Sequence, residues 1–584
     1  MRPKTETVGE ILAQLQDCTR LGARFVSASE QADFYPYHEI VRRAKQSAAY
    51  LQSVGLKPGD RVAVILPTGV EFFDAFLGTQ LAGAVPTALY PPFRLGKLDE
   101  YFTRLRRMLS RVEARFLITE KRIRRLIGEG VAGVGSLRAV IEASELSSRS
   151  GEPTCPAVDP DSPAFFQFSS GSTSDPKAVV ISHRNLACNL AMMQQVLVQR
   201  DASEVENGGV CWLPLYHDMG LVGCLYLGLY YPATMTYLGP DLFLGRPAMW
   251  LRALSRYAAA ISPAPNFAYA YCVNKIRDEE LDGVDLSRWR IALNGAEPID
   301  PDSVRSFTER FSRWGLSSEA ITPVYGLAEA GLGVSFTGLD DAPLISEFDR
   351  DVLATEARAV RGQGRRLVSV GSPLPGIAVE IRSADERALP EGEVGRVVIR
   401  GPSVTSGYFN DPEATARVMR DGWLDTGDLG FFSDGQLYIV GRVKDLIIIR
   451  GRNFAPQEVE ELLFTVPGLR AGCAVALGGF VEGQGEQLII LAESDPRNPR
   501  NSEEVIAEVQ SRVRSGLGLN SHHVELLPPG TLPRTSSGKL RRSEALRQFV
   551  AGELVPPEKV TALKLLLEMG KSRLAWSRFS SQQR

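Results

Sequence analysis

The chain has 584 residues, of which 44% are hydrophobic and 23% are charged, and its formal net charge is −3. This composition is typical of a folded globular protein with a large core, and it excludes a disordered chain, a collagen-like fibre and a basic protein that coats polyanions. We therefore expect no nucleic-acid binding. The seven cysteines form no Cys-x-x-Cys pair and the five histidines form no His-Glu-x-x-His motif, which argues against a disulfide scaffold and common zinc sites.

Two features bear on location. The N-terminal residues lack the apolar core of a signal peptide, so we expect a cytoplasmic protein. The stretch 219–240 contains no charged residue and is long enough to span a bilayer. Its glycines and the internal Pro232 favour a buried helix that leads into a strand, and we expect no transmembrane segment.

The predicted elements indicate an α/β fold in the first part of the chain. A strand over 59–67, a helix over 71–81 and a strand over 84–90 alternate, as in layered domains with a largely parallel sheet. From about Gly376 the strands are closely spaced and predict a small β-rich subdomain, with strands at 377–381, 395–400 and 436–440.

After Arg442 the pattern becomes a compact α+β unit. Its predicted strands cover 446–449, 471–477 and 487–492, and its helices cover 457–464 and 502–513. We therefore expect a large N-terminal α/β domain over 1–443 and a small, mobile α+β C-terminal domain over 444–584.

A loop rich in small hydroxyl residues joins two apolar runs, and it reads Ser169-Ser-Gly-Ser-Thr-Ser-Asp-Pro-Lys177. Backbone N–H groups and hydroxyls in such a loop suit phosphate oxygens. The loop is not a Walker A motif, and no Rossmann Gly-x-Gly-x-x-Gly follows any strand. By composition alone a solvent-exposed Ser/Gly turn explains it equally well.

The order of seven motifs decides between these explanations, because it resembles that of the adenylate-forming enzymes. These enzymes include acyl-CoA synthetases, adenylation domains of nonribosomal peptide synthetases, and luciferases. After the loop come Trp212-Leu-Pro-Leu-Tyr-His217-Asp-Met-Gly-Leu221, Asn294-Gly-Ala-Glu-Pro298, Tyr325-Gly-Leu-Ala-Glu329, Gly422-Trp-Leu-Asp-Thr-Gly-Asp428, Gly441-Arg-Val-Lys-Asp445 and Pro533-Arg-Thr-Ser-Ser-Gly-Lys539. The resemblance covers nearly the whole chain apart from about the last thirty residues.

The motifs at His217 and Asn294 resemble those of fatty acyl-AMP ligases in particular. The 46 positions from Tyr325 to Gly371 exceed the spacing typical of acyl-CoA synthetases, and the excess falls at about 338–366. In fatty acyl-AMP ligases an insertion here is thought to restrain the small domain and to disfavour transfer to coenzyme A. A surface loop of no consequence would look the same in the sequence.

The resemblance implies an ATP- and Mg²⁺-dependent ligase. A fatty carboxylate would attack the α-phosphate of ATP to give acyl-AMP and pyrophosphate. The acyl group would then pass to the phosphopantetheine of an acyl carrier protein, in lipid, polyketide or nonribosomal peptide biosynthesis. A fatty acyl-CoA synthetase is the near alternative, and a non-catalytic protein that binds acyl-adenylate is the alternative from another class.

The resemblance also implies roles for single residues. Lys539 would bridge the carboxylate and the α-phosphate, His217 would stand at the mouth of the acyl tunnel, and Lys444 would be the hinge. Glu329 and Thr173 would supply hard oxygens to Mg²⁺. The tunnel wall would include Met219, Gly220 and Phe267. The remaining ATP- and AMP-binding residues would be Ser169, Ser170, Gly171, Ser172, Thr173, Lys177, Asn294, Gly295, Ala296, Glu297, Pro298, Tyr325, Gly326, Leu327, Ala328, Asp428 and Arg442.

Within that set, Tyr325 would stack on adenine, and Asp428 would accept hydrogen bonds from the ribose hydroxyls with Arg442 beside it. Each residue also has an ordinary structural explanation, such as a core tyrosine for Tyr325 or a solvated loop lysine for Lys539. Ala178 departs from the glycine usual after Pro-Lys, and it fits if the backbone there is extended.

The last residues, 571–584, form a basic tail with no acidic residue. Such a tail could dock an acidic carrier protein or an anionic membrane surface. A solvated C-terminal helix is the favoured interpretation.

Overall fold

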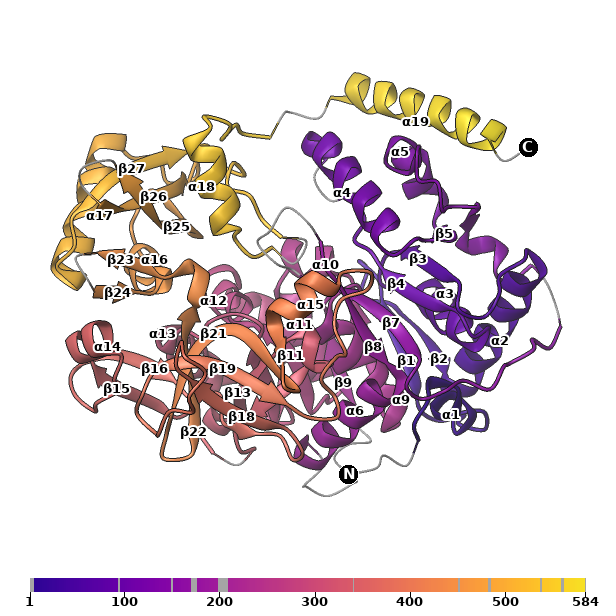
Figure 1. The fold of residues 1–584 in the computed structure, drawn as a ribbon, viewed down its shortest axis with the longest axis horizontal. Helices are drawn as coiled ribbons and strands as arrows, with labels where there is room; N and C mark the ends of the chain where they lie inside the picture. The colour runs from indigo at the N-terminus through magenta and orange to yellow at the C-terminus, as the bar shows by residue number, and fades with distance from the viewer. Residues whose placement is uncertain are drawn as a thin grey trace.

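The computed structural model describes residues 5–92, 95–148, 151–169, 176–197, 208–339, 341–449, 452–481, 485–535, 538–557 and 561–582. The N-terminal part forms a broad body, a smaller α+β unit sits against one side of it, and the last helix returns over the body (Figure 1). The α/β fold class, with a large first domain and a smaller second one, is therefore confirmed.

The first sheet has six strands in the order β6-β5-β3-β4-β7-β8. Neighbouring strands are parallel except for the antiparallel pair β7 and β8. The strands are β3 (Arg61–Ile65), β4 (Val85–Ala88), β5 (Phe116–Thr119), β6 (Ala139–Glu142), β7 (Pro163–Phe168) and β8 (Ala178–Ser182). Helix α3 (Val70–Leu81) is buried over most of its length, as the early strand–helix–strand pattern predicted. Ala178 begins a strand, so its extended backbone tolerates the extra methyl group.

The second sheet has nine strands in the order β17-β14-β13-β12-β11-β9-β10-β1-β2. The strands are β1 (Gly22–Val26), β2 (Ala32–Pro36), β9 (Gly209–Cys211), β10 (Met235–Leu238), β11 (Ile261–Pro265), β12 (Ile291–Gly295), β13 (Ile321–Gly326), β14 (Gly333–Phe336) and β17 (Ser372–Pro373). One large hydrophobic cluster joins this sheet to the first sheet and to the helices between them. The central strands are parallel and buried on both faces.

The uncharged stretch 219–240 is a buried helix that leads into a strand, as predicted. It comprises α8 (Asp218–Gly220), a π-helical turn (Leu221–Tyr226), α9 (Leu227–Tyr230) and then β10. Across the described ranges, no helix has both the length and the apolar character needed to cross a membrane.

Further helices of the large domain connect and cover these sheets. They are α1 (Val8–Ala13), α2 (Tyr37–Ser53), α4 (Leu98–Arg111), α5 (Lys121–Val131), α6 (His183–Leu197), α10 (Pro240–Gly245), α11 (Ala248–Arg256), α12 (Asn266–Lys275), α13 (Pro301–Phe311) and α15 (Pro412–Val418). The start of α13 shows how the local sequence fixes a boundary. Asp300 caps the helix by accepting from the backbone N–H groups of Asp302 and Ser303, and Pro301 occupies the first turn.

The predicted β-rich subdomain is a five-stranded antiparallel sheet. It contains β18 (Ala378–Arg382), β19 (Gly395–Arg400), β20 (Met419–Arg420), β21 (Trp423–Ser433) and β22 (Gln436–Arg442). The small α+β unit follows, and it contains β23 (Ile447–Ile449), β24 (Arg452–Phe454), α16 (Pro456–Leu463), β25 (Leu469–Val481), β26 (Gly485–Ser494), α17 (Ser502–Leu517), β27 (Ser521–Leu527) and α18 (Arg542–Val550). This unit has two hydrophobic clusters of its own.

The predicted insertion is an ordered hairpin that contacts the small unit. It consists of β15 (Ile345–Asp349), α14 (Arg350–Glu356) and β16 (Gly364–Val368). Arg350 donates to the carbonyl of Gly516 at 2.6 Å, and Arg365 pairs with Glu458 at 3.2 Å. Asp351 also pairs with Arg452. These contacts join the insertion to the small unit through charged groups.

The C-terminal helix α19 (Ala562–Gln582) packs against α5 of the large domain. The hydroxyl of Ser572 accepts from the Gly128 N–H at 2.9 Å, and the indole of Trp576 donates to the Arg124 carbonyl at 2.9 Å. The interpretation of the tail as a solvated helix is therefore wrong for one face of α19. The helix lies over α4 and α5 at the top of Figure 1.

Candidate active site

Three parts of the fold contribute to the candidate site: the nine-stranded sheet, the β-rich subdomain and the small α+β unit. Parallel strands β11, β12 and β13 end side by side at Pro265, Gly295 and Gly326. In α/β sheets, ligands bind outside the carboxyl ends of such strands. The hairpin β21–β22 contributes Asp428 and Arg442. The small unit contributes the loop that contains Lys539.

Tyr325 and Arg442 hold the Asp428 carboxylate from two sides. The Tyr325 hydroxyl donates to Oδ2 of Asp428 at 2.7 Å, and Nε of Arg442 donates to Oδ1 at 3.0 Å. Asp428 is buried, and its charge raises the pKa of Arg442. Burial, with the Asp428 charge added, raises the pKa of Tyr325. The three residues predicted to bind the nucleoside therefore form one hydrogen-bonded cluster.

Lys539 enters this region from the small unit. Burial lowers the pKa of its ammonium, the Glu297 and Asp218 carboxylates raise it, and Arg442 lowers it. The influence is mutual, because burial raises the pKa of Glu297 while Lys539 lowers it. The predicted catalytic lysine is therefore within electrostatic reach of the large domain's acidic groups, across the junction between the two units.

The segment 294–298 runs along the end of β12 with an unusual backbone. A Cβ on Gly295 would lie 2.7 Å from the carbonyl oxygen of Val324, so only glycine fits against β13. Ala296 follows with φ +67°, which is rare for a residue with a side chain. Asn294 is buried, Pro298 is exposed, and Glu297 accepts from the Phe267 N–H at 2.6 Å.

Only part of the predicted phosphate loop lies within the described residues. Ser170, Gly171, Ser172 and Thr173 lie outside them. At the ends of the loop, the Ser169 N–H donates to the Lys177 carbonyl at 3.1 Å.

Glu329 and Lys177 both contact one further side chain, that of Tyr408. The Tyr408 hydroxyl donates to Oε1 of Glu329 at 2.9 Å. The Lys177 ammonium stands 4.7 Å from the centroid of the Tyr408 ring. The backbone of the segment before Glu329 passes close to Leu332. A Cβ on Gly326 would lie 2.0 Å from the Leu332 carbonyl oxygen, so this position requires glycine.

The rest of that segment continues the turn. Leu327 donates its N–H to the Leu332 carbonyl at 2.9 Å, and Ala328 is buried in the short turn that carries Glu329. The segment 325–329 therefore brings Tyr325 and Glu329 to the same end of the sheet.

His217 precedes α8, and its surroundings favour the neutral imidazole. Burial lowers the pKa of His217 to about 4, with Lys539 lowering it further and Asp218 raising it. The predicted tunnel residues lie on the adjoining elements. Met219 and Gly220 belong to α8. Phe267 lies in the first turn of α12, where its ring centroid is 6.1 Å from that of Trp212.

Two residues at the site were not assigned by the sequence reasoning. Asp218 stands inside a matched motif next to His217, which could have drawn attention to it. Tyr408 lies in a segment, Gly407-Tyr-Phe-Asn410, that belongs to none of the seven motifs.

Lys444 lies in the turn Val443–Asp445 between the two units, where burial lowers its pKa. Its role as a hinge stays a prediction.

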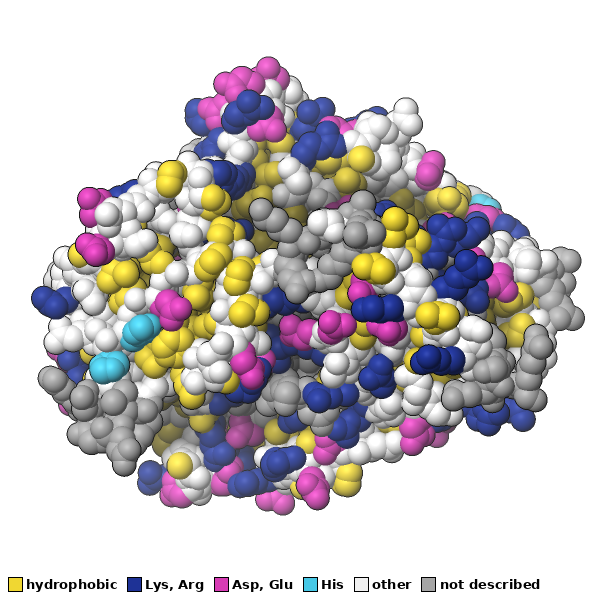
Figure 2. Space-filling view, turned by 90° about the horizontal axis from the view of Figure 1, so that it is seen from above, with side chains coloured by type: hydrophobic (Ala, Val, Ile, Leu, Met, Phe, Trp, Pro, Cys, Tyr) yellow, Lys and Arg dark blue, Asp and Glu magenta, His cyan; other side chains and the backbone are white. Residues whose placement is uncertain are grey.

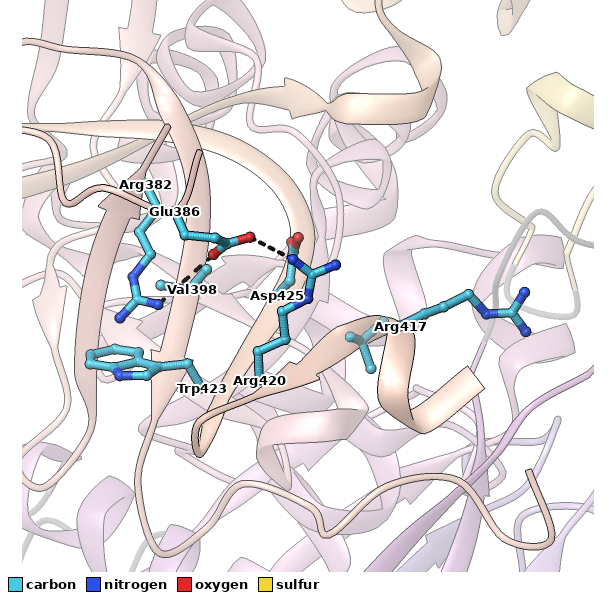
Figure 3. Close-up of a pocket in the computed structure, with 8 residues that line it drawn as sticks. Arg382, Glu386, Val398, Arg417, Arg420, Trp423 and Asp425 are labelled. Carbon is cyan, nitrogen blue, oxygen red and sulfur yellow. Dashed lines mark hydrogen bonds and ion pairs between the residues drawn. The ribbon is translucent and has the colours of Figure 1, made fainter. Parts of the chain in front are cut away.

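Figure 3 shows a separate pocket on the β-rich subdomain. In this pocket Glu386 pairs with Arg420 at 3.0 Å, and the Arg382 guanidinium lies 4.6 Å from the Trp423 ring centroid. It contains none of the predicted site residues. We therefore do not take it as the active site.

The residues of the candidate site fit a Mg²⁺ ion that is bound partly by substrate phosphates better than a metal ion bound by protein side chains alone. Within the described part of the chain, no group of three or more His, Cys, Asp or Glu residues could hold a metal ion. Mg²⁺ commonly binds through one or two carboxylates together with substrate phosphates. Glu329 supplies such a carboxylate, whereas Thr173 lies outside the described residues.

Known proteins share this architecture. The profile of the AMP-binding enzyme family matches residues 21–409. A putative acyl-CoA synthetase of Caulobacter vibrioides is 35% identical over 534 residues, which cover 90% of this chain and 91% of the relative. A long-chain-fatty-acid–AMP ligase of Mycobacterium marinum is 32% identical over 89% of this chain and 92% of its own.

A solved structure from a study of fatty acyl-adenylate ligases of E. coli and L. pneumophila is similar throughout. It has a TM-score of 0.87 and 34% identity, and the match covers 94% of this chain and 98% of that one. The chain therefore belongs to the family of AMP-binding enzymes, which use ATP. It is an adenylate-forming ligase, and its predicted resemblance to the fatty acyl-AMP ligases is confirmed.

Proposed function

We propose that the protein activates a fatty acid with ATP and Mg²⁺ to form acyl-AMP and pyrophosphate, and then passes the acyl group to the phosphopantetheine of an acyl carrier protein. The first step is supported by the charges of Glu297, Asp218 and Arg442, which act on the buried Lys539 ammonium, and by the hydrogen bonds that join Tyr325, Asp428 and Arg442. We infer that Lys539 brings a cation from the small unit to the proposed nucleoside site.

The chemistry requires the protein chiefly to neutralise and align two anions. A carboxylate and a triphosphate repel each other, so fixed positive charge at the reacting phosphate lowers the barrier. Lys539 would supply this charge between the carboxylate and the α-phosphate. A carboxylate oxygen forms a bond to the α-phosphorus, the bond from the α-phosphorus to the oxygen shared with the β-phosphorus breaks, and pyrophosphate leaves with that oxygen.

The remaining roles follow from position. Asp428 and Arg442 would bind the ribose, and Tyr325 would cover the adenine while its hydroxyl orients Asp428. The end of the phosphate loop at Lys177 would bind the β- and γ-phosphates. Glu329 and Thr173 would hold Mg²⁺, which neutralises phosphate charge when bound.

His217 would face the fatty carboxylate as a neutral group, since a pKa of about 4 keeps it uncharged at pH 7. Phe267 and Met219 would line the entrance of the acyl tunnel. Each CH₂ that an acyl chain buries there contributes about 0.8 kcal/mol. A fatty acid therefore gains affinity from its chain, while the polar groups select its carboxylate.

The insertion favours an acyl-AMP ligase over an acyl-CoA synthetase. Transfer to coenzyme A in this family of enzymes is expected to need rotation of the small unit at Lys444. The contacts of Arg350 and Arg365 with the small unit oppose such a rotation. A carrier protein as acceptor is further supported by a neighbouring structure, McyG A-PCP with phenylalanyl-adenylate, at 26% identity and TM-score 0.82.

The purified protein should be incubated with ATP, Mg²⁺ and radiolabelled fatty acids of several lengths, with and without coenzyme A. We expect acyl-AMP to accumulate, with little acyl-CoA, and added holo carrier protein to become acylated. Efficient acyl-CoA formation would contradict this proposal and identify the protein as a fatty acyl-CoA synthetase. Absence of any adenylate would leave a binding protein without turnover.

A further inference from the structure

Tyr408 touches two charged side chains that come from different parts of the proposed site. Its hydroxyl donates to Glu329 at 2.9 Å, and its ring faces the Lys177 ammonium at 4.7 Å from the centroid. An ammonium over an aromatic face and a phenol bonded to a carboxylate are both favourable contacts. One side chain therefore holds a cation and an anion at the same time.

The backbone fixes Tyr408 firmly enough for this role. The Phe409 N–H donates to the Ala178 carbonyl at 2.8 Å, next to Lys177. The Thr405 N–H donates to the carbonyl of Glu329 at 2.8 Å. The segment 405–409 is thus tied to both segments whose side chains Tyr408 touches.

Gly407 explains how the ring reaches its place. Its φ is +137°, and a Cβ there would lie 2.4 Å from a methyl carbon of Thr415. The hydroxyl of that threonine accepts from the Tyr408 N–H at 3.0 Å. The chain can therefore bend at Gly407 and bring Tyr408 inward only because no side chain is present.

The alternative arrangement would be a direct ion pair between Lys177 and Glu329. Both residues lie within the described ranges, and no such ion pair joins them. A direct pair would neutralise the two charges, and neither would then be available to a phosphate or a cation. Contact through a neutral tyrosine fixes both groups and preserves both charges.

We propose that Tyr408 is a positioning residue for the polyphosphate end of ATP, with its ring aligning Lys177 and its hydroxyl aligning Glu329. This inference rests on the proposed function, because it assumes that Lys177 and Glu329 act on phosphates and Mg²⁺. The two contacts are chemically separable. Phenylalanine at position 408 keeps the ring and loses the hydroxyl, whereas leucine loses both.

The test is a comparison of Tyr408→Phe and Tyr408→Leu by calorimetry with metal-free ATP and with MgATP. We expect Tyr408→Phe to bind metal-free ATP like the wild type and to bind MgATP about tenfold more weakly, since a hydrogen bond to a charged group is lost. We expect Tyr408→Leu to weaken both. Equal behaviour of the two variants, or no effect of either, would overturn the proposal.

Two controls separate positioning from a general structural effect. Tyr50 also donates its hydroxyl to a carboxylate, that of Glu145 at 2.7 Å, so Tyr50→Phe removes the same kind of bond elsewhere. The Tyr50→Phe variant should bind metal-free ATP and MgATP like the wild type. In a Glu329→Ala background, Tyr408→Phe should have no further effect on MgATP binding. A full additional loss there would contradict action through Glu329.

A third variant covers the case in which Tyr408→Leu does not fold. Lys177→Met removes the ammonium and should reproduce the expected loss of metal-free ATP binding, which Tyr408→Phe does not show. Acyl-AMP formation by the wild type is measured in the same samples. A wild type that binds ATP without forming acyl-AMP would overturn the proposed function while the binding pattern still decides the role of Tyr408.

Discussion

The hydroxyl of Tyr325 donates a 2.7 Å hydrogen bond to Asp428, a residue 103 positions later in the chain. The bond joins the end of β13 in the nine-stranded sheet to β21 in the β-rich subdomain. Arg442 holds the other oxygen of the same carboxylate at 3.0 Å. Two protein groups therefore orient the carboxylate that is proposed to bind the ribose.

Tyr325→Phe should weaken ATP binding without abolishing the chemistry. The ring that would cover adenine remains, but Asp428 loses a hydrogen bond to a charged acceptor, worth about 1.5–3 kcal/mol. We expect the KM for ATP to rise about tenfold or more with kcat little changed. Steady-state kinetics of acyl-AMP formation measures this. A loss confined to kcat would contradict a role in orienting the ribose-binding group.

Lys539→Ala should lower the rate of adenylation by about a hundredfold to a thousandfold, as expected when one stabilising charge is removed from a reacting oxyanion. Single-turnover formation of acyl-AMP is the measurement. Lys57→Ala, at an exposed lysine of the large domain, is the matched control. An unchanged rate for Lys539→Ala would mean that this lysine is a structural partner of Glu297 and Asp218.

Arg365→Ala should free the small unit from the insertion. Arg365 and Glu458 are nearly buried, with 11% and 8% of their side chains exposed, and an unpaired Glu458 would cost about 3–5 kcal/mol. We expect more acyl-CoA relative to acyl-AMP and faster proteolysis near residue 444. Arg358→Ala removes an exposed pair with Glu356 on the same insertion and should change neither. No change in the product ratio would separate the insertion from the choice of acceptor.

Gly128→Ala should release α19 from α5. An added Cβ would lie 2.4 Å from the backbone oxygen of Ser572, a contact that real structures avoid. We expect faster proteolysis between α18 and α19 and a lower Tm, with adenylation retained. Gly135→Ala is the matched control, because a Cβ there meets nothing within 4 Å. A protease-resistant tail in Gly128→Ala would show that the helix tolerates the methyl group by shifting.

His183 makes stability depend on pH. Its ring nitrogen Nδ1 accepts from the Val8 N–H at 3.2 Å, and burial lowers its pKa from 6.5 to about 4, against a smaller effect of Glu10. Between pH 6.5 and 4 the unfolded chain binds a proton that the folded protein does not. Stability should therefore fall by about 3 kcal/mol as pH drops through this window and be fully present above it.

The replacement His183→Asn keeps an acceptor for the Val8 N–H but does not titrate. Urea unfolding of this variant should show a weaker loss of stability between pH 6.5 and 4 than the wild type shows. The exposed His522→Asn serves as the control and should follow the wild type. Parallel curves for all three proteins would assign the acid sensitivity to other groups.

Much of the fold could be predicted because its signals are local. The alternation of apolar runs and helices predicted the parallel sheet, and the switch to short strands after Gly376 predicted the β-rich subdomain. The segment 338–366, predicted to be an insertion, was visible as excess length between two motifs. In each case the evidence lay in periodicity or spacing, which a sequence records directly.

The C-terminal helix shows where local signals end. Its composition predicted a helix, but α5 as its partner depends on Gly128 and Ser572, which stand 444 positions apart. Tyr408 was missed for the same reason. It lies in no motif, and its contacts with Lys177 and Glu329 exist only because segment 405–409 pairs with β8 and with the turn at Glu329.

The sequence by itself determined the family, the order of the motifs and the residue types available for nucleotide chemistry. This was possible because phosphate-binding loops and reactive side chains occur at fixed local spacings. Only the tertiary structure decided which of them meet. The electrostatic influence between Lys539 and Glu297, the hydrogen bond from Tyr325 to Asp428 and the contacts of segment 345–368 with the small unit all join segments far apart in the chain. Their distances follow from how sheets and domains pack, which local spacing does not encode.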